Sequence, residues 1–486
     1  MRLSELFREV EFDGSIKNDA DINLVTDDSR LVRPGSLFVC IRHRSFDGHT
    51  AALDALASGA AAVVTQNRLG LENELHVADS RSAYARLCAA LCNHPERKLR
   101  LIGATGTNGK TTVTTLIRNI LSDSGTKTLL TGTVCNRLGD ENLPSGLTTP
   151  KPPELYSLLS RAVSQRCKAC VMEASSQALA QGRLEGIDFD AAVFTNITRD
   201  HLDYHGTFEN YISAKKKLFE HSALSIVNLD DPRANEIIAA SKGKIITFST
   251  VLDCADYTAK NISLLSDCVR FELVSKGHIE HIEFASPGLF SVSNAMAAAV
   301  CAINLGIEPK DAAQSLAKSK SVCGRLERVE CSAPYSVIID YAHTPDGLEQ
   351  VLRALRPSCR GKLIVLFGCG GDRDRSKRPL MGAAACKYAD KIIVTSDNPR
   401  SEDPIKIIGD ILKGTDKKRR DLFVEPDRRK AIALALKTAE PGDTVLLAGK
   451  GHEKYQLIGG EKLPLDERET VRKILGLPHD TGRKKQ

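Results

Sequence analysis

Apolar and polar positions along the 486-residue chain repeat in the order strand, turn, helix. After the first hundred residues, short apolar runs each lead into a turn and a stretch with helical spacing; they are Leu99–Gly103, Cys170–Glu173, Ala191–Thr195 and Ser225–Asn228. A second series follows Arg325, at Ser336–Asp340, Lys362–Phe367, Lys391–Thr395 and Thr444–Ala448. This alternation predicts an α/β protein with a mostly parallel, doubly wound sheet, followed by a Rossmann-like layer.

The remaining patterns suggest how the domains are divided. The N-terminal region has strand-like runs at Ser36–Ile41 and Ala60–Thr65, separated by an alanine-rich helical segment. A β-rich stretch, Asp267–Phe284, predicts a hairpin before a helix at Asn294–Leu305. Since a domain usually spans about 100–200 residues, the length favours about three domains. We expect them at residues 1–87, 88–325 and 326–486.

Composition and charge narrow the class of protein. With 42% hydrophobic and 26% charged residues, the chain resembles an ordinary globular protein with an ample core. The longest apolar stretch, Ala295–Ile303, is too short to cross a bilayer, and the N-terminus lacks an export signal, so we expect a cytoplasmic protein without membrane insertion. Basic runs at Lys417–Arg420 and Arg483–Lys485 contribute to a net charge of +6. Because Trp is absent and aromatics make up only 5%, we interpret both runs as solvated surface and expect no nucleic-acid partner.

The 14 cysteines do not form a recognisable metal framework. Cys167 and Cys170 are the one C-x-x-C pair, whereas zinc frameworks need two such pairs. Cys170 also opens an expected buried strand. We therefore interpret both as reduced core thiols, which indicates a reducing compartment.

The most informative segment is Gly103–Thr112, which joins a strand-like run to a helix-like pattern at Val113–Leu121. It matches the phosphate-binding loop G-x-x-x-x-G-K-[ST], except that Ala104 replaces the first glycine. In such loops the lysine, here Lys110, reaches the outer phosphates, and the hydroxyl of Thr111 can ligate Mg²⁺. The alternative interpretation is a glycine-rich turn that merely caps a helix. Such a turn does not require a strand before it, a Lys-Thr pair within it and a helix after it, and this segment has all three. The segment predicts nucleoside triphosphate binding by Gly106, Thr107, Asn108, Gly109, Lys110, Thr111 and Thr112.

Charged side chains follow several of the predicted strands. Glu173 ends one strand, where open α/β sheets bind their ligands, and suits either a Mg²⁺ ligand or a helix-capping partner. His201 and His205 are spaced i, i+4 among acidic residues, which is typical of a metal site and also of an ordinary polar helix start. One of the lysines at 215–217 can turn inward, and the pattern leaves open which. A second glycine-rich turn, Gly368–Gly371, lacks the remaining features of a dinucleotide site, so NAD is not expected.

Taken in order, several segments resemble the Mur ligases, ATP-dependent enzymes that form amide bonds in bacterial cell-wall synthesis. These segments are Thr26–Arg30, Gly106–Thr112, Leu147–Pro150, Met172–Ser176, Asp200–His205, Gly324–Glu327, Asp340–Pro345 and Ala448–Glu453. The turn Asp397–Arg400 narrows the resemblance to members that add meso-2,6-diaminopimelate to UDP-N-acetylmuramoyl-L-alanyl-D-glutamate. The resemblance implies three domains: a small N-terminal UDP-binding domain, a central P-loop ATPase, and a C-terminal Rossmann-like domain that binds the amino acid.

The resemblance also implies a mechanism. ATP would phosphorylate the γ-carboxylate of D-glutamate, and the amine of diaminopimelate would attack the acyl phosphate. Lys110 and Mg²⁺ would supply the positive charge that phosphoryl transfer between two anions requires. By family analogy Thr111 and Glu173 bind one Mg²⁺, while Glu173, His201 and a carbamylated Lys215 surround a second, which leaves Lys216 and Lys217 on the surface.

Binding residues for the two nucleotides are implied in the same way. The uridine end falls on Ser29, and the diphosphate–muramoyl portion falls on Thr148, Thr149, Ser175, Gln181 and Arg183. Where the family often has a His-Gln-Ala-like element, this chain reads Arg44-Ser45-Phe46. Asn294, Arg325 and Asp340 fall where the family holds adenine, phosphate and ribose, although each alone would pass as structural.

The implied diaminopimelate pocket comprises Arg373, Asp397, Asn398, Pro399, Arg400, Gly449 and Glu453. Diaminopimelate differs from lysine by one distal carboxylate, which Arg400 can grip with two parallel hydrogen bonds. Without the other motifs, a plain turn after a strand would be the favoured explanation of Asp397–Arg400. A lysine-adding Mur ligase, folylpolyglutamate synthase and a P-loop phosphotransferase stay open as alternatives, and we expect a monomer.

Overall fold

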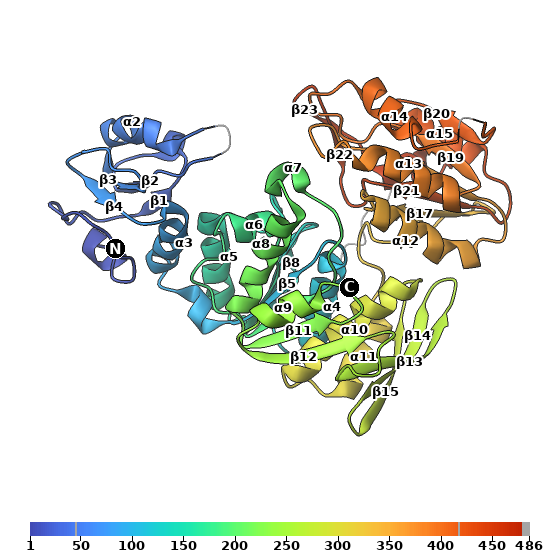
Figure 1. Cartoon of the computed structure of the whole chain (residues 1–486), viewed down its shortest axis with the longest axis horizontal. Coiled ribbons are helices and arrows are strands. Elements are labelled where there is room, and N and C mark those ends of the chain that lie inside the picture. Colours follow the sequence, from blue (N-terminus) through green and yellow to red (C-terminus); the bar gives the residue numbers. More distant parts are fainter. Residues whose placement is uncertain (44–45, 417, 479–486) are drawn as a thin grey trace.

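The computed structural model describes residues 1–43, 46–416 and 418–478. Figure 1 shows three lobes in chain order: a small N-terminal lobe, a large central lobe, and a C-terminal lobe beside the central one. The N-terminal lobe contains a parallel sheet in the order β1-β2-β3-β4. Its elements are α1 (Leu3–Leu6), β1 (Leu24–Thr26), β2 (Ser36–Val39), α2 (Ala52–Ala57), β3 (Ala60–Thr65), β4 (Glu74–His76) and α3 (Ser80–Leu91).

The helix α3 connects the N-terminal lobe to the central one. Asp79 immediately precedes this helix, and its side chain accepts hydrogen bonds from the backbone N–H groups of Arg81 and Ser82, the usual role of an N-cap aspartate. Leu87 of α3 belongs to the same buried apolar cluster as Leu155 of the central lobe and Leu37 of the N-terminal sheet. This shared core joins the two lobes through buried apolar side chains.

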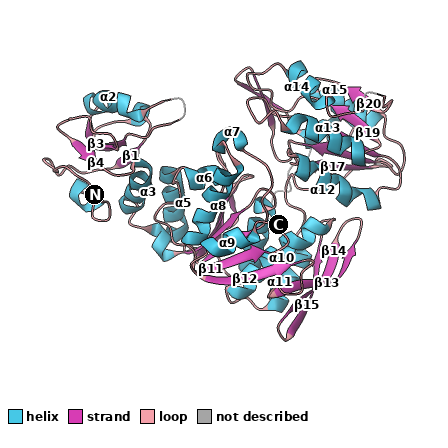
Figure 2. Ribbon diagram, viewed as in Figure 1, coloured by secondary structure: helices cyan, strands magenta, loops and turns pink. Residues whose placement is uncertain are grey.

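The central lobe is built on an 11-stranded sheet in the order β15-β14-β13-β12-β11-β10-β5-β9-β6-β7-β8. Strands from β13 to β6 run parallel, and antiparallel pairs extend both edges. The strands are β5 (Arg100–Thr105), β6 (Thr128–Thr131), β7 (Asn136–Leu138), β8 (Glu141–Leu143), β9 (Ala169–Glu173), β10 (Ala191–Phe194), β11 (Leu224–Asn228), β12 (Lys244–Ser249), β13 (Tyr257–Leu264), β14 (Val269–Ser275) and β15 (His278–Phe284). The helices, cyan in Figure 2, are α4 (Lys110–Asp123), α5 (Pro152–Ser164), α6 (Ser176–Ala180), α7 (Leu202–His205), α8 (Phe208–Glu220), α9 (Ala234–Ala240), α10 (Leu289–Asn304) and α11 (Pro309–Lys318).

Both faces of the central sheet are buried, as expected for parallel strands. Leu101 of β5 packs into the apolar cluster that includes α3, α5 and α8, whereas the next residue, Ile102, packs into the cluster formed with α4, α10 and α11. Cys170 and Val171 of β9 divide between the two cores in the same way. The continuous apolar runs in the sequence are therefore explained by helices on both sides of each strand.

The C-terminal lobe repeats this layered plan with a six-stranded sheet in the order β16-β17-β21-β18-β19-β20, parallel except for β16. Its strands are β16 (Glu327–Arg328), β17 (Ser336–Asp340), β18 (Leu363–Phe367), β19 (Lys391–Val394), β20 (Leu422–Val424) and β21 (Thr444–Ala448), with a separate hairpin of β22 (Tyr455–Ile458) and β23 (Glu461–Pro464). The helices are α12 (Pro345–Leu355), α13 (Lys377–Tyr388), α14 (Pro404–Leu412), α15 (Arg428–Lys437) and α16 (Glu467–Ile474). Among the described residues, no helix is both long and apolar enough to span a membrane.

The α/β architecture predicted from the apolar runs is confirmed, with two differences in detail. The expected hairpin at Asp267–Phe284 is present as β14 and β15, but it continues the central sheet through β13, which the pattern did not reveal. The following helix begins at Leu289 rather than at Asn294. The residue before it, Gly288, has a φ of +91°, a backbone conformation outside the helical range.

Candidate active site

The phosphate-binding loop lies between β5 and α4, as its sequence predicted. Gly109 immediately precedes the helix with a φ of +89°, a backbone conformation that glycine adopts without steric cost. The backbone N–H of Asn108 donates to the side-chain oxygen of Asn196, which follows β10, at 2.9 Å. The Lys110 ammonium donates to the backbone carbonyls of Gly106 and Thr107, at 2.8 and 2.9 Å. Lys110 is therefore held by main-chain oxygens and has no carboxylate partner among the described residues.

Glu173 lies at the end of β9, next to this loop, and is only 1% exposed. Its carboxylate accepts hydrogen bonds from the Thr111 hydroxyl at 3.0 Å, and from the backbone N–H and hydroxyl of Thr133 at 2.7 and 2.9 Å. The helix α6 that follows is capped by Ser175 instead. Of the two interpretations of Glu173, the capping partner is therefore wrong, and the carboxylate lies beside the hydroxyl of the phosphate loop.

Lys215 resolves the question left by the three consecutive lysines. It lies on α8, is 1% exposed, and its amine donates to the Gly106 carbonyl at 2.7 Å. Burial, together with the charge of nearby Lys110, lowers the pKa of Lys215 well below its usual value. Lys216 instead pairs with Glu236 at 2.8 Å, and Lys217 is exposed. Only Lys215 turns toward the phosphate loop.

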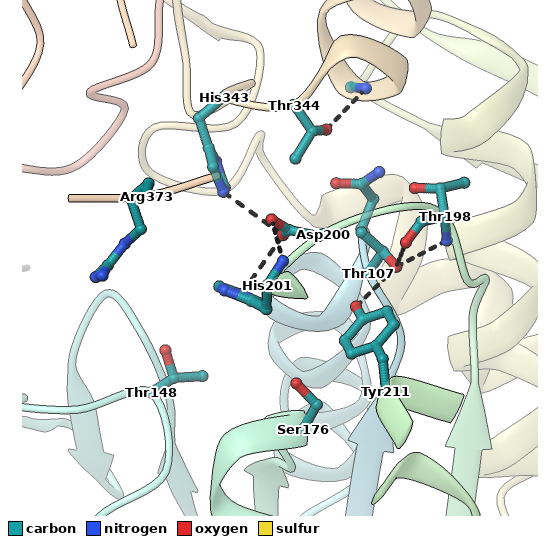
Figure 3. A network of polar contacts seen from close by, with 12 residues as sticks. Thr107, Thr148, Ser176, Thr198, Asp200, His201, Tyr211, His343, Thr344 and Arg373 are labelled. Atoms are coloured by element: carbon teal, nitrogen blue, oxygen red, sulfur yellow. Dashed lines mark hydrogen bonds and ion pairs between the residues drawn. The ribbon is translucent and has the colours of Figure 1, made fainter. Parts of the chain in front are cut away.

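Two histidines from different lobes approach one buried aspartate, Asp200 (Figure 3). The Asp200 carboxylate lies 3.4 Å from His201 Nε2 and 3.9 Å from Nε2 of His343, which follows β17 in the C-terminal lobe. Burial alone would raise the pKa of Asp200, but His201, His343 and Lys377 hold it at about 2. Burial lowers the pKa of His201 to about 4 against the opposing charge of Asp200, so its imidazole is neutral at physiological pH.

The other member of the expected histidine pair is used differently. Nε2 of His205 lies 3.0 Å from the Ser176 hydroxyl, and its ring packs against Tyr204 and Tyr211. Its contacts tie α7 to α6. The sequence did not single out His343 or assign a role to Asp200, although both lie in segments that follow predicted strands.

A cavity of about 550 Å³ is lined by most of the residues that we expect to bind ATP. It is lined by the phosphate loop from Gly106 to Thr112 and by Glu173, His201, Lys215, Asn294, Arg325 and Asp340. Two hydrogen bonds join the phosphate-loop side of the cavity to its C-terminal side: Arg325 donates to the Thr111 hydroxyl at 3.0 Å, and Asn108 of the loop donates to Asp346 at 3.2 Å. The Asp340 carboxylate accepts two backbone N–H groups at 2.7 Å, and burial raises its pKa. The carboxyl ends of β5, β9, β10 and β17 therefore meet at one site.

The residues expected to bind the nucleotide sugar are only partly gathered here. Thr148, Ser175 and Arg183 line the cavity. The Thr149 hydroxyl is fully buried and donates to the Glu173 carbonyl at 2.6 Å, so it supports the end of β9 instead of facing the cavity. Gln181 accepts both Nε and Nη2 of Arg183, at 2.9 and 2.7 Å. Ser29 is half-buried in the N-terminal lobe, outside the cavity lining, and Arg44 and Ser45 lie outside the described residues.

The residues expected to bind diaminopimelate form a separate group at the carboxyl ends of β18, β19 and β21. Arg373 and Arg400 both approach Gly370, and Nη1 of Arg400 donates to the Gly371 carbonyl at 2.7 Å. The backbone of Arg400 adopts a φ of +54° and pairs with the β22 strand through Leu457. Arg373 also lies 3.8 Å from Asp203 of α7, which links this group to the central lobe.

The other members of the group meet around a second glycine. Asn398 donates to Glu453 at 2.9 Å, and a Cβ on Gly449 would lie 2.7 Å from the Asp397 carboxylate. Pro399 presents its carbonyl to Gly371 so closely that no side chain fits there. The turn Asp397–Arg400 therefore packs against the loops from both neighbouring strands, and it is more than an isolated surface turn.

Comparisons with known proteins agree with this geometry. Residues 104–302 match the Mur ligase middle domain, and residues 324–451 match the Mur ligase glutamate ligase domain. The chain belongs to the Mur ligase family of ATP-dependent acid–amino-acid ligases.

Within that family, several relatives that match almost the whole chain share a name. A UDP-N-acetylmuramoyl-L-alanyl-D-glutamate--2,6-diaminopimelate ligase of Caldanaerobacter subterraneus subsp. tengcongensis is 44% identical, covering 98% of this chain and 99% of the relative. The ligase of the same name from Syntrophomonas wolfei is 42% identical, with the same coverage of 98% and 99%. A solved structure of such a ligase, 35% identical, superimposes with a TM-score of 0.70 over 98% of this chain and 99% of the other.

Proposed function

We propose that this chain uses ATP to join meso-2,6-diaminopimelate to the D-glutamate γ-carboxylate of UDP-N-acetylmuramoyl-L-alanyl-D-glutamate, a step in peptidoglycan precursor synthesis. The observation that carries the proposal is the cavity where the phosphate loop, Glu173 and Lys215 meet the start of the C-terminal lobe. This arrangement suits transfer of a phosphoryl group to a carboxylate, because the donor and acceptor are held together next to fixed cations.

Three ranges would divide the work. Residues 1–87 would bind the uridine end through Ser29, residues 88–325 would bind ATP and the muramoyl portion, and residues 326–486 would bind the amino acid. Each range contains its own sheet, which supports this division. Because ATP and nucleotide-linked precursors are cytoplasmic compounds, we place the enzyme in the cytoplasm, and we propose that it acts as a monomer.

The chemistry has two steps. An oxygen of the γ-carboxylate attacks the terminal phosphorus of ATP and ADP leaves, which gives an acyl phosphate. The amine of diaminopimelate then attacks the acyl carbon, loses a proton, and inorganic phosphate leaves. Because both reactants of the first step are anions, Lys110 and Arg325 would hold them together by neutralising their charge.

The residues around Glu173 fit magnesium. The Glu173 carboxylate and the Thr111 hydroxyl, 3.0 Å apart, are hard oxygen ligands of the kind that hold Mg²⁺ together with nucleotide phosphates. Bound there, Mg²⁺ would supply positive charge to the transferred phosphoryl group. The neutral imidazole of His201 suits a ligand of a second ion, with Glu173 and Lys215.

Lys215 would act as a carbamate. Burial lowers the pKa of its amine and so favours the neutral form, which can attack CO₂. The new N–C bond forms as the amine nitrogen loses a proton, which gives an anionic carbamate. Lys215 would then contribute an oxygen ligand next to Gly106, where an ammonium would repel a second cation.

The amino acid would bind in the C-terminal group. Arg400 would pair with the distal carboxylate of diaminopimelate, Arg373 would take the other carboxylate, and Glu453 with the Gly449 backbone would receive an ammonium. Lysine lacks that carboxylate, so it would leave the Arg400 guanidinium unpaired, at a cost of about 1–3 kcal/mol.

The test is the release of phosphate from ATP in the presence of Mg²⁺ and the UDP-muramoyl dipeptide. We expect fast release with meso-diaminopimelate, slow release with lysine, and little release without an amine. Release that is independent of the amine would contradict the ligase proposal and favour a phosphotransferase. Equal rates with both amines would contradict only the assignment of diaminopimelate as the preferred substrate.

A further inference from the structure

Lys450 is a fully buried lysine that has no role in the mechanism above. It is 0% exposed and lies in the loop after β21, between two glycines with positive φ, +109° at Gly449 and +52° at Gly451. A Cβ on Gly449 would approach Asp397, and a Cβ on Gly451 would approach the Gly324 carbonyl at 2.8 Å. The two glycines let the loop fold tightly enough to bury the Lys450 side chain.

The Lys450 ammonium binds directly to the proposed amino-acid site. It donates to Glu453 Oε2 at 2.7 Å and to Asn398 Oδ1 at 2.8 Å, and it lies 3.7 Å from the Asp397 carboxylate. Asn398 donates in turn to the same Glu453 oxygen at 2.9 Å. Lys450, Asn398 and Glu453 therefore form a closed triangle of hydrogen bonds, with the Tyr455 ring 5.3 Å from the ammonium.

Within this triangle, only one of the two carboxylate oxygens of Glu453 accepts hydrogen bonds. Its Oε2 accepts two hydrogen bonds, whereas Oε1 has no hydrogen-bond partner among the described residues. The Asn398 amide is also fixed in orientation, because its oxygen accepts both Lys450 and the backbone N–H of Leu457 at 3.0 Å. The Glu453 carboxylate is thus held in place through Oε2, while Oε1 keeps its capacity to accept a hydrogen bond.

Lys450 also reduces the negative charge of the proposed amino-acid site. Asp397 and Glu453 carry two negative charges, and Lys450 cancels one of them, which leaves a single negative charge. Arg400 faces this pair: burial and then Arg373 lower its pKa, while Asp397 and Glu453 act in the opposite direction. A site with one free negative charge beside an arginine is complementary to the ammonium and carboxylate of one amino-acid centre.

We propose that Lys450 is a specificity-determining positioning residue, which holds Glu453 and Asn398 so that the site accepts a zwitterionic distal centre rather than a lone ammonium. This inference rests on the proposed function, because it assigns a role in binding diaminopimelate. Without Lys450 the site would carry an additional negative charge and a vacancy of ammonium size. Both changes favour an amine that has no distal carboxylate, such as lysine.

The experiment compares Lys450→Ala with the wild-type enzyme and with Lys391→Ala, a matched control. Lys391 is in the same lobe, but its amine donates to the Thr438 carbonyl at 2.9 Å, away from the triangle. We expect Lys450→Ala to raise KM for diaminopimelate about tenfold or more, with KM for ATP changed less than about twofold. The rate ratio of diaminopimelate to lysine should fall, and Lys391→Ala should match the wild type.

Chemical rescue distinguishes positioning from general damage. Ethylammonium chloride added to Lys450→Ala should lower KM for diaminopimelate toward the wild-type value, and it should have no effect on the wild type. Lys450→Arg serves as a second variant, and a thermal shift with ADP verifies that each variant is folded. The inference is overturned if a folded variant keeps its KM for diaminopimelate, or if kcat and every KM change together without rescue. A wild-type enzyme that ignores diaminopimelate would instead refute the proposed function itself.

Discussion

The central cavity and the amino-acid group of the C-terminal lobe hold their charges in opposite ways. In the cavity, Lys110 and Lys215 donate to backbone carbonyls, and Glu173 accepts from hydroxyl and backbone donors. In the C-terminal lobe, charged side chains pair with one another, as in Lys450 with Glu453 and the fully buried pair of Arg428 with Glu467.

This difference follows from what each region has to bind. Phosphoryl transfer brings anions into the cavity and releases them, so its cations have to stay unpaired until the reactants arrive. A zwitterionic amino acid brings no net charge at its distal centre, so its site can be neutralised in advance. We therefore expect removal of a cavity charge to reduce activity, and disruption of the buried Arg428–Glu467 pair beneath the amino-acid loops to reduce stability.

The largest effect is expected for Lys110→Ala. The variant loses the lysine that we propose reaches the outer phosphates, so kcat should fall about 10³-fold. Its melting temperature should not fall, because the ammonium contacts only the loop carbonyls of Gly106 and Thr107. Phosphate release and thermal melting measure the two quantities. Lys216→Ala, which removes the half-buried partner of Glu236, is the matched control and should behave like the wild type.

The second prediction concerns stability and is tested with the variant Glu467→Gln. Its partner Arg428 is fully buried and also donates to the Ser396 carbonyl at 3.1 Å and the Ala448 carbonyl at 2.8 Å, just before the two loops of the amino-acid group. Leaving that guanidinium without a carboxylate should cost about 3 kcal/mol of unfolding free energy, measured in urea by circular dichroism. Glu461→Gln, in the exposed hairpin, is the control. A variant as stable as the wild type would contradict the stability half of the comparison.

Lys215→Ala is expected to lower kcat about 10²-fold, since a ligand of the proposed metal site is lost. A short carboxylate such as acetate or formate can occupy the vacated space and should restore part of the activity. The assay is phosphate release with increasing acetate, for which the wild type provides the baseline. Full activity of the variant without acetate would show that Lys215 is not part of the site.

Local signals in the sequence predicted most of the fold and part of the site. The runs at Ser336–Asp340 and Thr444–Ala448 became β17 and β21 without change, because strands buried on both faces are apolar throughout. The strand β13 was missed because its outer half, residues 261–264, is mostly exposed and gives no continuous apolar run. The inward turn of Lys215 had a readable signal, since it shares a helical stripe with buried Tyr211 and Leu218.

Contacts between distant segments carried no such signal. Asp200 and His343 come from different lobes, so no spacing in the chain could indicate their approach. The hydroxyl of Thr149 looks like a substrate donor until the fold buries it against the Glu173 carbonyl. Lys450 lay within a segment of the family resemblance, but only its three-dimensional contacts with Asn398 and Glu453 suggest a role.

The smallest effect is expected for Arg400→Ala, which tests whether the amino-acid group recognises a carboxylate. Removing the guanidinium should raise KM for diaminopimelate about tenfold, the equivalent of one lost charge-assisted contact, and should not lower the slow rate with lysine, because lysine would no longer leave a guanidinium unpaired. Arg400→Lys should rescue little, because an ammonium cannot form two parallel hydrogen bonds. Arg375→Ala is the control, since Arg375 is 71% exposed and contacts only Glu402 at 3.2 Å. Equal losses with both amines would mean that Arg400 supports the loop through its bond to Gly371 and does not select the substrate, so the two arginine-bearing loops would be structural and selection would depend on the Lys450 triangle alone.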